Sequence, residues 1–138
     1  MPSKEKNRVL VVAAHPDDEV LGCGGTIAQM ATDGEVHIAI LGEGISARYN
    51  QRGEVSSSEL ETLKQQACEA ARILGVRSVK FGQLPDNRFD ELPLLDVVKI
   101  VEQWVKEFQP NIIYTHHPGD LNVDHVITFR AVLTATRP

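Results

Sequence analysis

The sequence predicts an α/β protein with a parallel sheet that is covered by helices on both faces. Short and almost wholly apolar runs alternate with longer segments whose apolar residues recur at helical spacing. This alternation is typical of strand–helix–strand units, and continuous apolar strands are typical of a parallel sheet buried on both sides. The chain has 138 residues, which suits a single domain.

Four apolar runs are expected to form the strands, and they cover residues 9–14, 36–41, 79–81 and 112–115. The first reads Val-Leu-Val-Val-Ala-Ala and contains no polar residue, as expected for a central strand. We expect the spatial order 3-2-1-4, which is half of a doubly wound sheet. In that order the first and fourth strands are neighbours, and a crevice opens between the loops that follow them.

The segments between the strands are expected to form four helices, at about 20–33, 58–74, 93–109 and 124–135. A capping box of Ser58 and Glu61 predicts the start of the second helix, and Gly75 predicts its end. Two longer polar loops, 42–57 and 82–92, lie at the edge where such folds bind ligands.

Composition and charge restrict the class of partner. Hydrophobic residues make up 42% and charged residues 24%, as in soluble globular proteins. The net charge of -5 argues against nucleic acid or an anionic membrane as the partner, because both favour a basic face. Cys23 and Cys68 are far apart and are expected to be free thiols, as in a reducing compartment. No apolar run is long enough for a signal sequence or a membrane span, so we expect a cytoplasmic protein.

The loop after the first strand reads His-Pro-Asp-Asp-Glu at residues 15–19. One aspartate is enough to cap the next helix, so Asp17 or Asp18 as an N-cap is the simpler interpretation. His15 together with two carboxylates on one short turn favours a metal site instead. A hydrolytic zinc site takes about three histidine or carboxylate ligands and keeps a position for water, whose proton a nearby carboxylate can take.

Three glycines follow this loop, Gly22, Gly24 and Gly25. We expect them to let the first helix pack closely on a strand, which is the commoner role of such glycines. A phosphate-binding role is disfavoured, because the spacing is not Gly-x-Gly-x-x-Gly and the preceding acids would repel a pyrophosphate.

The segment after the fourth strand is also rich in histidine and aspartate, and it contains His116, His117, Asp120, Asp124 and His125. His37 lies inside the second strand instead and is expected to be structural. Because the first and fourth strands are expected to be neighbours, we expect the two polar segments to face each other across the crevice.

Residues 14–19 read Ala-His-Pro-Asp-Asp-Glu, and Asp124 is followed directly by His125. The first run matches the signature of the PIG-L/LmbE family of N-acetylglucosaminyl deacetylases, and the second matches the end of that family's second motif. The sequence resembles this family over most of its length. The resemblance implies a Rossmann-like domain that hydrolyses an N-acyl group with zinc, usually an acetyl group on an amino sugar.

The same resemblance implies roles for individual residues. It implies that His15, Asp18 and His125 bind Zn²⁺, with another divalent transition metal as the alternative, and that Asp17 is the general base. It also implies that Asp86 contacts sugar hydroxyls. The expected partner is therefore a small N-acetylated sugar.

One position departs from the family pattern. Many members have His-Pro-Asp-His in the second motif, and the first of these histidines is replaced here by Asn122. An asparagine can donate a hydrogen bond to an oxyanion, but it cannot protonate a leaving amine. That proton would come from Asp17 after it has served as the base, or from His116 or His117.

Two further pairs of residues have alternative interpretations. The resemblance also implies a substrate-binding arginine in the loop after the second strand, where Arg48 and Arg52 are both candidates. Asp120 and Asp124 are expected either to orient metal-bound imidazoles or to cap the fourth helix.

Family members usually continue beyond the point where this sequence ends. We therefore expect residues 1–138 to form one deacetylase-like domain without the family's C-terminal part. The fourth strand would then be an exposed edge, which predicts either association into a homo-oligomer or lower stability than that of a longer form. Two other functions remain as alternatives. One is a nucleotide-binding domain with Glu43 as the acid after the second strand, and the other is a metal-binding relative without catalytic activity.

Overall fold

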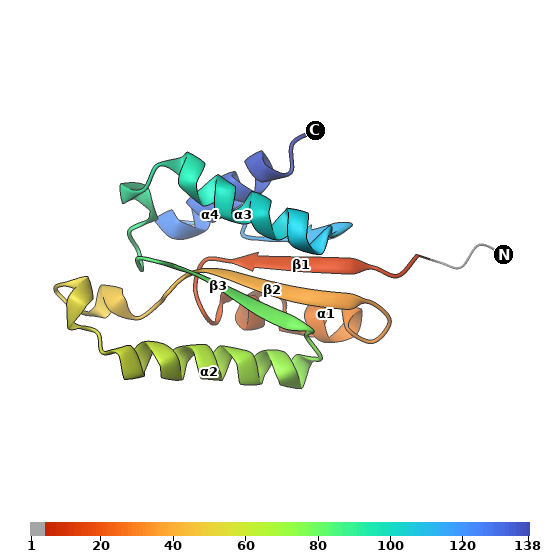
Figure 1. Cartoon of the computed structure of the whole chain (residues 1–138), viewed down its shortest axis with the longest axis horizontal. Helices are drawn as coiled ribbons and strands as arrows, with labels where there is room; N and C mark the ends of the chain where they lie inside the picture. Colours follow the sequence, from red (N-terminus) through yellow and green to blue (C-terminus); the bar gives the residue numbers. More distant parts are fainter. Residues whose placement is uncertain (1–4) are drawn as a thin grey trace.

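The computed structural model describes residues 5–138, and its sheet is parallel with the order β3-β2-β1-β4. The strands are β1 (Arg8–Ala13), β2 (Glu35–Gly42), β3 (Ser78–Leu84) and β4 (Ile112–Tyr114). The helices are α1 (Asp18–Met30), α2 (Ser57–Leu74), α3 (Leu94–Phe108) and α4 (Val123–Ala135). Helices α3 and α4 lie above the sheet in Figure 1, and α1 and α2 lie below it. The predicted fold class, strand order and two-sided helix cover are confirmed.

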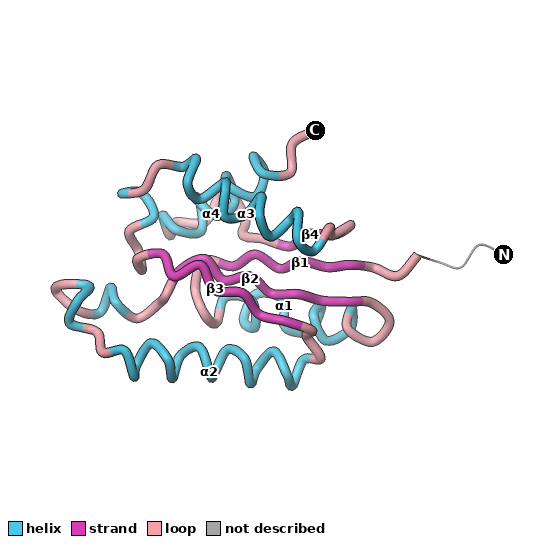
Figure 2. The backbone as a smooth tube through the Cα atoms, viewed as in Figure 1, coloured by secondary structure: helices cyan, strands magenta, loops and turns pink. Residues whose placement is uncertain are grey.

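The sheet separates two hydrophobic cores, which explains why β1 is apolar at every position after Arg8. Leu10 packs in the core that contains Val101 of α3, whereas its neighbour Val9 packs in the core that contains Ile27 of α1. Successive side chains of a strand point to opposite faces of the sheet, so a strand with helices on both sides needs apolar residues at every position. Figure 2 shows the strands lying side by side between the two helical layers.

Two boundaries differ from the sequence prediction. Strand β3 extends over Ser78–Leu84, further than the expected 79–81, because its polar residues lie on an edge strand and interrupt the apolar run. Helix α2 starts at Ser57, and its capping box is formed by Ser56 and Glu59 rather than by Ser58 and Glu61. Both pairs have the same spacing in the sequence, but Ser56 has the extended backbone that an N-cap requires.

The expected role of the α1 glycines is wrong. A Cβ atom added to Gly22 or Gly25 would meet no atom within 4 Å, so these glycines do not mediate close packing. They lie inside the helix, which is irregular at Cys23 (φ -145°), and they form no phosphate-binding turn. Gly22 instead lines an open groove of about 420 Å³ between α1 and the ends of β1 and β4.

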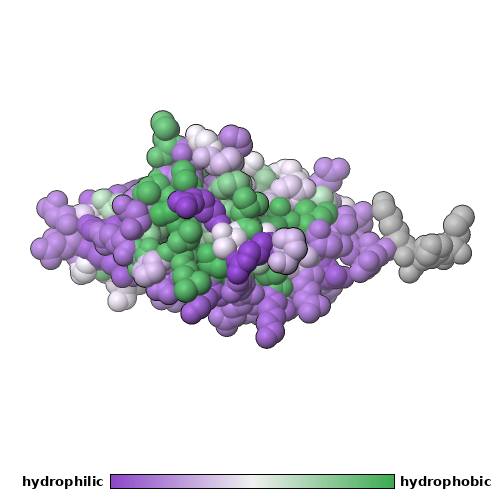
Figure 3. All heavy atoms as spheres, turned by 90° about the horizontal axis from the view of Figure 1, so that it is seen from above, coloured by the Kyte–Doolittle hydropathy of each residue, from purple (hydrophilic) through white to green (hydrophobic). Residues whose placement is uncertain are grey.

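Strand β4 pairs with β1 and is an edge strand within residues 5–138. The face over α3 and α4 shows apolar side chains in its middle (Figure 3), and Leu95 and Leu133 on these helices are exposed. The expected self-association is consistent with this edge and face, and it stays a prediction. Within the described part of the chain, no helix combines the length and apolarity needed to cross a membrane. Cys23 and Cys68 are free thiols.

Candidate active site

The two polar segments meet at the carboxyl end of the sheet, where β1 and β4 lie side by side. His15 follows β1, and His125 lies in the first turn of α4. Although the two residues are 110 positions apart, His15 Nδ1 lies 3.3 Å from His125 Nε2. The strand order therefore brings together residues from the two ends of the sequence.

His15, Asp18 and His125 form a compact triangle of ligand atoms. Asp18 Oδ2 lies 3.4 Å from His15 Nδ1 and 3.2 Å from His125 Nε2. In a tetrahedral zinc site with bonds of about 2.0–2.1 Å, two ligand atoms are about 3.3–3.4 Å apart. The three edges of this triangle therefore fit ligands that share one small divalent cation.

Each imidazole of the triangle also has a carboxylate partner on its outer side. His15 Nε2 donates to Asp124 Oδ2 at 2.8 Å, and His125 Nδ1 donates to Asp120 Oδ2 at 2.8 Å. A ring nitrogen that donates to a carboxylate carries the proton, so the lone pair of the other nitrogen faces the centre of the triangle. Carboxylates of this kind commonly orient metal-binding histidines. The capping alternative for Asp120 and Asp124 is not what the structure shows, because the side chain that caps α4 is that of Asn122.

The charges around the triangle favour a cation at its centre. Burial lowers the pKa of His15, but its hydrogen bonds to Asp124 and Asp18 raise it more, to about 10. Burial raises the pKa of Asp18, and its hydrogen bonds with His15 lower it further than burial raises it. The donor set thus fits a divalent cation in both geometry and charge.

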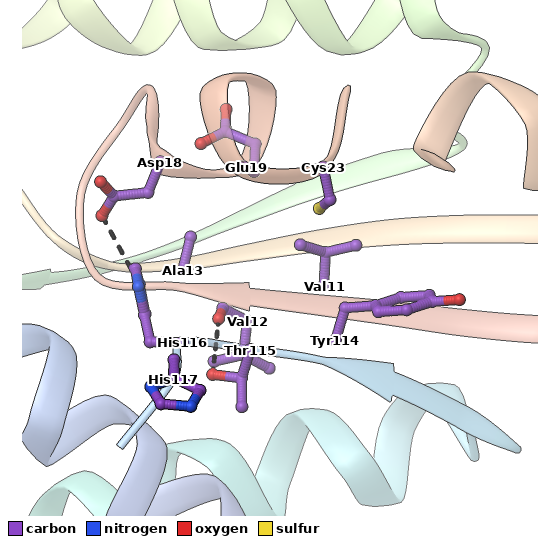
Figure 4. Close-up of a pocket in the computed structure, with 11 residues that line it drawn as sticks. Val11, Val12, Ala13, Asp18, Glu19, Cys23, Tyr114, Thr115, His116 and His117 are labelled. Carbon is purple, nitrogen blue, oxygen red and sulfur yellow. Dashed lines mark hydrogen bonds and ion pairs between the residues drawn. The ribbon is translucent and has the colours of Figure 1, made fainter. Parts of the chain in front are cut away.

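His116 and His117, the expected alternative acids, have different surroundings. His116 Nε2 accepts the Ala14 N–H at 2.9 Å, and its ring stacks on His125 with 4.0 Å between centroids. Burial and the nearby His125 lower the pKa of His116 to about 4. Figure 4 shows Asp18 reaching across the crevice toward His116, whose Nε2 lies 3.5 Å from Asp18 Oδ2. These contacts favour a supporting role for a neutral His116. His117 is exposed, and its Nδ1 accepts the Gly119 N–H.

Asp17 occupies the N-cap position of α1, but its side chain makes no capping hydrogen bond. Its backbone has φ 144°, a value that residues other than glycine rarely adopt. Burial and the charge of Asp18 raise the pKa of Asp17, while the charges of His15, His125 and Arg48 act in the opposite direction. The exposed Asp17 carboxylate is thus within electrostatic range of His15 and His125, and no capping hydrogen bond holds it to the helix.

The structure distinguishes the two candidate arginines. Arg52 donates from Nε and Nη2 to both oxygens of Glu43, at 2.8 and 2.9 Å, so its guanidinium is already engaged. Arg48 is exposed, and its charge acts on Asp17. Arg48 is therefore the better placed of the two to meet a substrate. Glu43, which the nucleotide-binding alternative required, is held in an ion pair with Arg52.

Asp86 and Asn122 belong to one hydrogen-bond network around Asn87. Asp86 is 6% exposed, accepts the Ala47 N–H through Oδ2, and has Oδ1 at 3.3 Å from His15 Nε2. Asn122 Oδ1 accepts the N–H groups of the first turn of α4, and its Nδ2 donates to Asn87 Oδ1 at 3.0 Å. Sequence reasoning missed Asn87, which also donates from Nδ2 to Asp86. In the sequence, only the position of Asn87 directly after Asp86 indicated that it could belong to the site.

A triangle of two histidines and one aspartate at the crevice of a parallel α/β sheet defines a class of candidate metal-dependent enzymes. Residues 10–136 match the model of the family described as PIG-L, GlcNAc-PI de-N-acetylase. The chain therefore belongs to the PIG-L family of deacetylases.

Two curated relatives are similar over nearly the whole chain. One is 1D-myo-inositol 2-acetamido-2-deoxy-alpha-D-glucopyranoside deacetylase from Mycolicibacterium smegmatis, which is 31% identical over 163 residues, with 98% of this chain and 56% of the relative covered. The other is the uncharacterized deacetylase YaiS from Escherichia coli, which is 27% identical over 140 residues, with 98% of this chain and 71% of the relative covered.

Two solved structures are also similar. N,N'-diacetylchitobiose deacetylase from Pyrococcus horikoshii has a TM-score of 0.81 and 25% identity, with 97% of this chain and 51% of that chain covered. The 4-carboxy-2-hydroxymuconate hydratase GalB from Pseudomonas putida has a TM-score of 0.76 and 28% identity, with 92% of this chain and 54% of that chain covered. The chain thus spans about half the length of these two proteins.

Proposed function

We propose that this protein hydrolyses the N-acetyl or other N-acyl group of an amino sugar or its conjugate, with release of acetate or the corresponding acid. The observation that carries this proposal is the triangle of His15, Asp18 and His125, whose edges of 3.2–3.4 Å fit one tetrahedral cation. Family membership supports hydrolysis of an N-acetylated sugar. Its relatives include a 1D-myo-inositol 2-acetamido-2-deoxy-alpha-D-glucopyranoside deacetylase and a diacetylchitobiose deacetylase.

His15, Asp18 and His125 would hold the metal, which we propose to be Zn²⁺. Another divalent transition metal would fit the same ligands. When bound, the ion supplies Lewis acidity, which polarises a carbonyl and lowers the pKa of a water molecule. Asp124 and Asp120 keep the two imidazoles in the tautomer that leaves a lone pair for the ion.

Asp17 is the proposed general base. Its carboxylate is exposed beside the ligand Asp18 and is free of capping bonds, so it can accept a proton from the attacking water. The same carboxyl group can then pass this proton to the leaving nitrogen. His116 is less suited to that step, because its Nε2 already accepts the Ala14 N–H.

Three residues are proposed to act on the substrate. Arg48 offers an exposed guanidinium beside Asp17, suited to an oxygen-rich group of the sugar or its conjugate. Asp86 is proposed to offer sugar hydroxyls the lone pairs that its hydrogen bonds from the Ala47 N–H and Asn87 leave free. Asn122 Nδ2 carries a second hydrogen besides the one donated to Asn87, and this second hydrogen is the proposed donor to the oxyanion.

Substitution of the two adjacent aspartates tests this mechanism. Asp18→Asn should weaken zinc binding, because an amide is a poorer zinc ligand than a carboxylate. Asp17→Asn should keep the zinc and lower kcat by about 10²–10⁴-fold with little change in KM, because it removes the general base. Zinc content and acetate release from N-acetylated amino sugars are measured for both variants beside the parent chain. Near-parental turnover of zinc-loaded Asp17→Asn would remove Asp17 from the mechanism.

A second candidate function is the addition of water to a carbon–carbon double bond. It is favoured by the 28% identity to a hydratase, which covers 92% of this chain. The divalent cation that His15, Asp18 and His125 would hold and the carboxylate of Asp17 could serve either reaction. The two functions are separated by parallel assays, in which acetate release from amino sugars supports deacetylation and loss of the absorbance of a conjugated unsaturated acid supports hydration.

A further inference from the structure

The turn that carries the proposed base is strained. Asp17 has φ 144° and ψ -26°, outside the regions that residues with a Cβ atom normally populate. Such a conformation persists only where surrounding contacts enforce it, and it is often found at functional sites. The contacts that enforce it therefore also determine where the Asp17 carboxylate lies.

Glu19 supplies one of these contacts. The Asp17 N–H donates to Glu19 Oε2 at 3.1 Å, and the Glu19 side chain is buried, with the residue 2% exposed. On the other side of the turn, the His15 N–H donates to Asp18 Oδ2 at 2.8 Å. Glu19 thus fixes the peptide between Pro16 and Asp17, whereas Asp18 fixes the peptide between Ala14 and His15.

Ordinary helix capping does not account for Glu19. In a capping box the side chain at the third helical position accepts the N-cap N–H and the N-cap side chain accepts a backbone N–H in return, whereas Glu19 is at the second helical position and Asp17 accepts no backbone N–H. Glu19 is also buried beside the carboxylates of Asp17 and Asp18. Among residues 5–138 no lysine, arginine or histidine forms an ion pair with it. Burying a carboxylate in such a place lowers stability, so its contribution must lie in the geometry of the turn.

We propose that Glu19 is a positioning residue, which holds the backbone of Asp17 in the turn from which its carboxylate serves as the base. The inference rests on the proposed function, because it assumes that Asp17 is that base. Glu19 itself does not touch the substrate in this scheme and acts only through Asp17.

The test compares two substitutions of Glu19. Glu19→Met keeps the length of the side chain and removes the acceptor, whereas Glu19→Gln keeps an oxygen that can accept the Asp17 N–H. Cys23→Ala is the matched control, because Cys23 lines the same groove one turn further along α1. If Glu19→Met fails to fold, Glu19→Asp replaces it, since the shorter side chain withdraws the acceptor by one methylene group.

The first readout is independent of activity. Hydrogen exchange of the Asp17 amide should become about tenfold faster or more in Glu19→Met, and should stay near the parental rate in Glu19→Gln and Cys23→Ala. Unchanged protection of this amide in Glu19→Met would contradict the inference.

The second readout is kinetic. In Glu19→Met, kcat should fall about tenfold or more with KM and zinc content unchanged. This loss should not exceed the about 10²–10⁴-fold contribution of the general base itself. In an Asp17→Asn background the same substitution should have no further effect on kcat, because Glu19 acts only through the base. Additive losses in the double variant would indicate a general structural role instead.

The outcomes also separate this inference from the function on which it rests. If the parent chain releases no acetate from any N-acylated amino sugar, the proposed function fails and the positioning role fails with it. If the parent is active and Glu19→Met keeps full turnover, only the inference about Glu19 is wrong.

Discussion

Replacing Asp124 by asparagine should affect metal affinity and folding stability together. Asp124 is fully buried, and its carboxylate accepts three hydrogen bonds, from His15 Nε2 at 2.8 Å, the Asn87 N–H at 2.7 Å and the Phe89 N–H at 3.0 Å. In Asp124→Asn one oxygen becomes an NH₂ group, which must face one of these N–H donors. The charge that strengthens the other two hydrogen bonds is also lost.

The size of the effect follows from these contacts. A hydrogen bond to a charged group contributes about 1.5–3 kcal/mol, and a buried donor left without an acceptor is costly. One lost and two weakened hydrogen bonds should lower the free energy of unfolding by about 3 kcal/mol. Metal affinity should fall by about 10–100-fold, because His15 loses the carboxylate that orients it.

Asp120→Asn is the matched control. Asp120 accepts from His125 Nδ1 as Asp124 accepts from His15 Nε2, but its side chain is 37% exposed, against 0% for Asp124. Asp120→Asn should therefore weaken metal binding and leave the free energy of unfolding nearly unchanged.

Unfolding is followed by circular dichroism in urea with a chelator present, so that bound metal does not add to stability. Zinc affinity is measured by competition with a chromophoric chelator. If Asp124→Asn and Asp120→Asn change stability to the same small extent, the three hydrogen bonds of Asp124 do not support the fold as argued.

Two further predictions concern the second strand and the loop that follows it. Arg48→Ala should raise KM for an N-acetylated sugar about tenfold at unchanged stability. Arg52→Ala should instead lower thermal stability, because it removes the ion-pair partner of Glu43. Steady-state kinetics and melting curves of both variants test this, and equal effects on KM would contradict it. His37 forms a hydrogen bond with Ser78 and stacks on Phe108, and burial lowers its pKa in the folded state. The stabilising contribution of neutral His37 is therefore present above the unfolded pKa of about 6.5 and is lost as pH falls through the lower folded pKa. The free energy of unfolding of the parent should therefore fall relative to that of His37→Gln as pH decreases from about 7.5 to 5, and a pH-independent difference would refute this role.

Most of the fold was predictable because its signals are local. The apolar run at residues 9–14 identified the central strand, and Gly75 correctly predicted the end of α2. The capping box was misplaced by two residues, because three consecutive serines offer the same spacing in two registers. The surroundings of the α1 glycines were predicted wrongly, because a sequence does not show whether the space beside a helical glycine is filled or open.

The candidate site was predictable in its residue types but not in its hydrogen bonds. Strand order and family resemblance together pointed to His15, Asp18 and His125, which the structure brings within ligand distance of one another. The choice between Arg48 and Arg52 depended on which guanidinium Glu43 engages. A sequence cannot show such a contact, because Arg48 and Arg52 are separated by only four residues in one irregular loop.

Strand β4 joins the sheet through only three residue pairs, the last of which is Val11 with Tyr114, and it leads directly into the segment that carries His125. Short edge strands and the helices attached to them open at lower free energy than the centre of a sheet. One opening of the β4–α4 unit would withdraw His125 from a bound ion and, at the same moment, would remove Asp120 and Asp124 from the imidazoles that they orient. The lifetime of the bound ion would then be limited by this opening rather than by the strength of any single ligand bond, so metal release and hydrogen exchange of the α4 amides should show the same dependence on temperature.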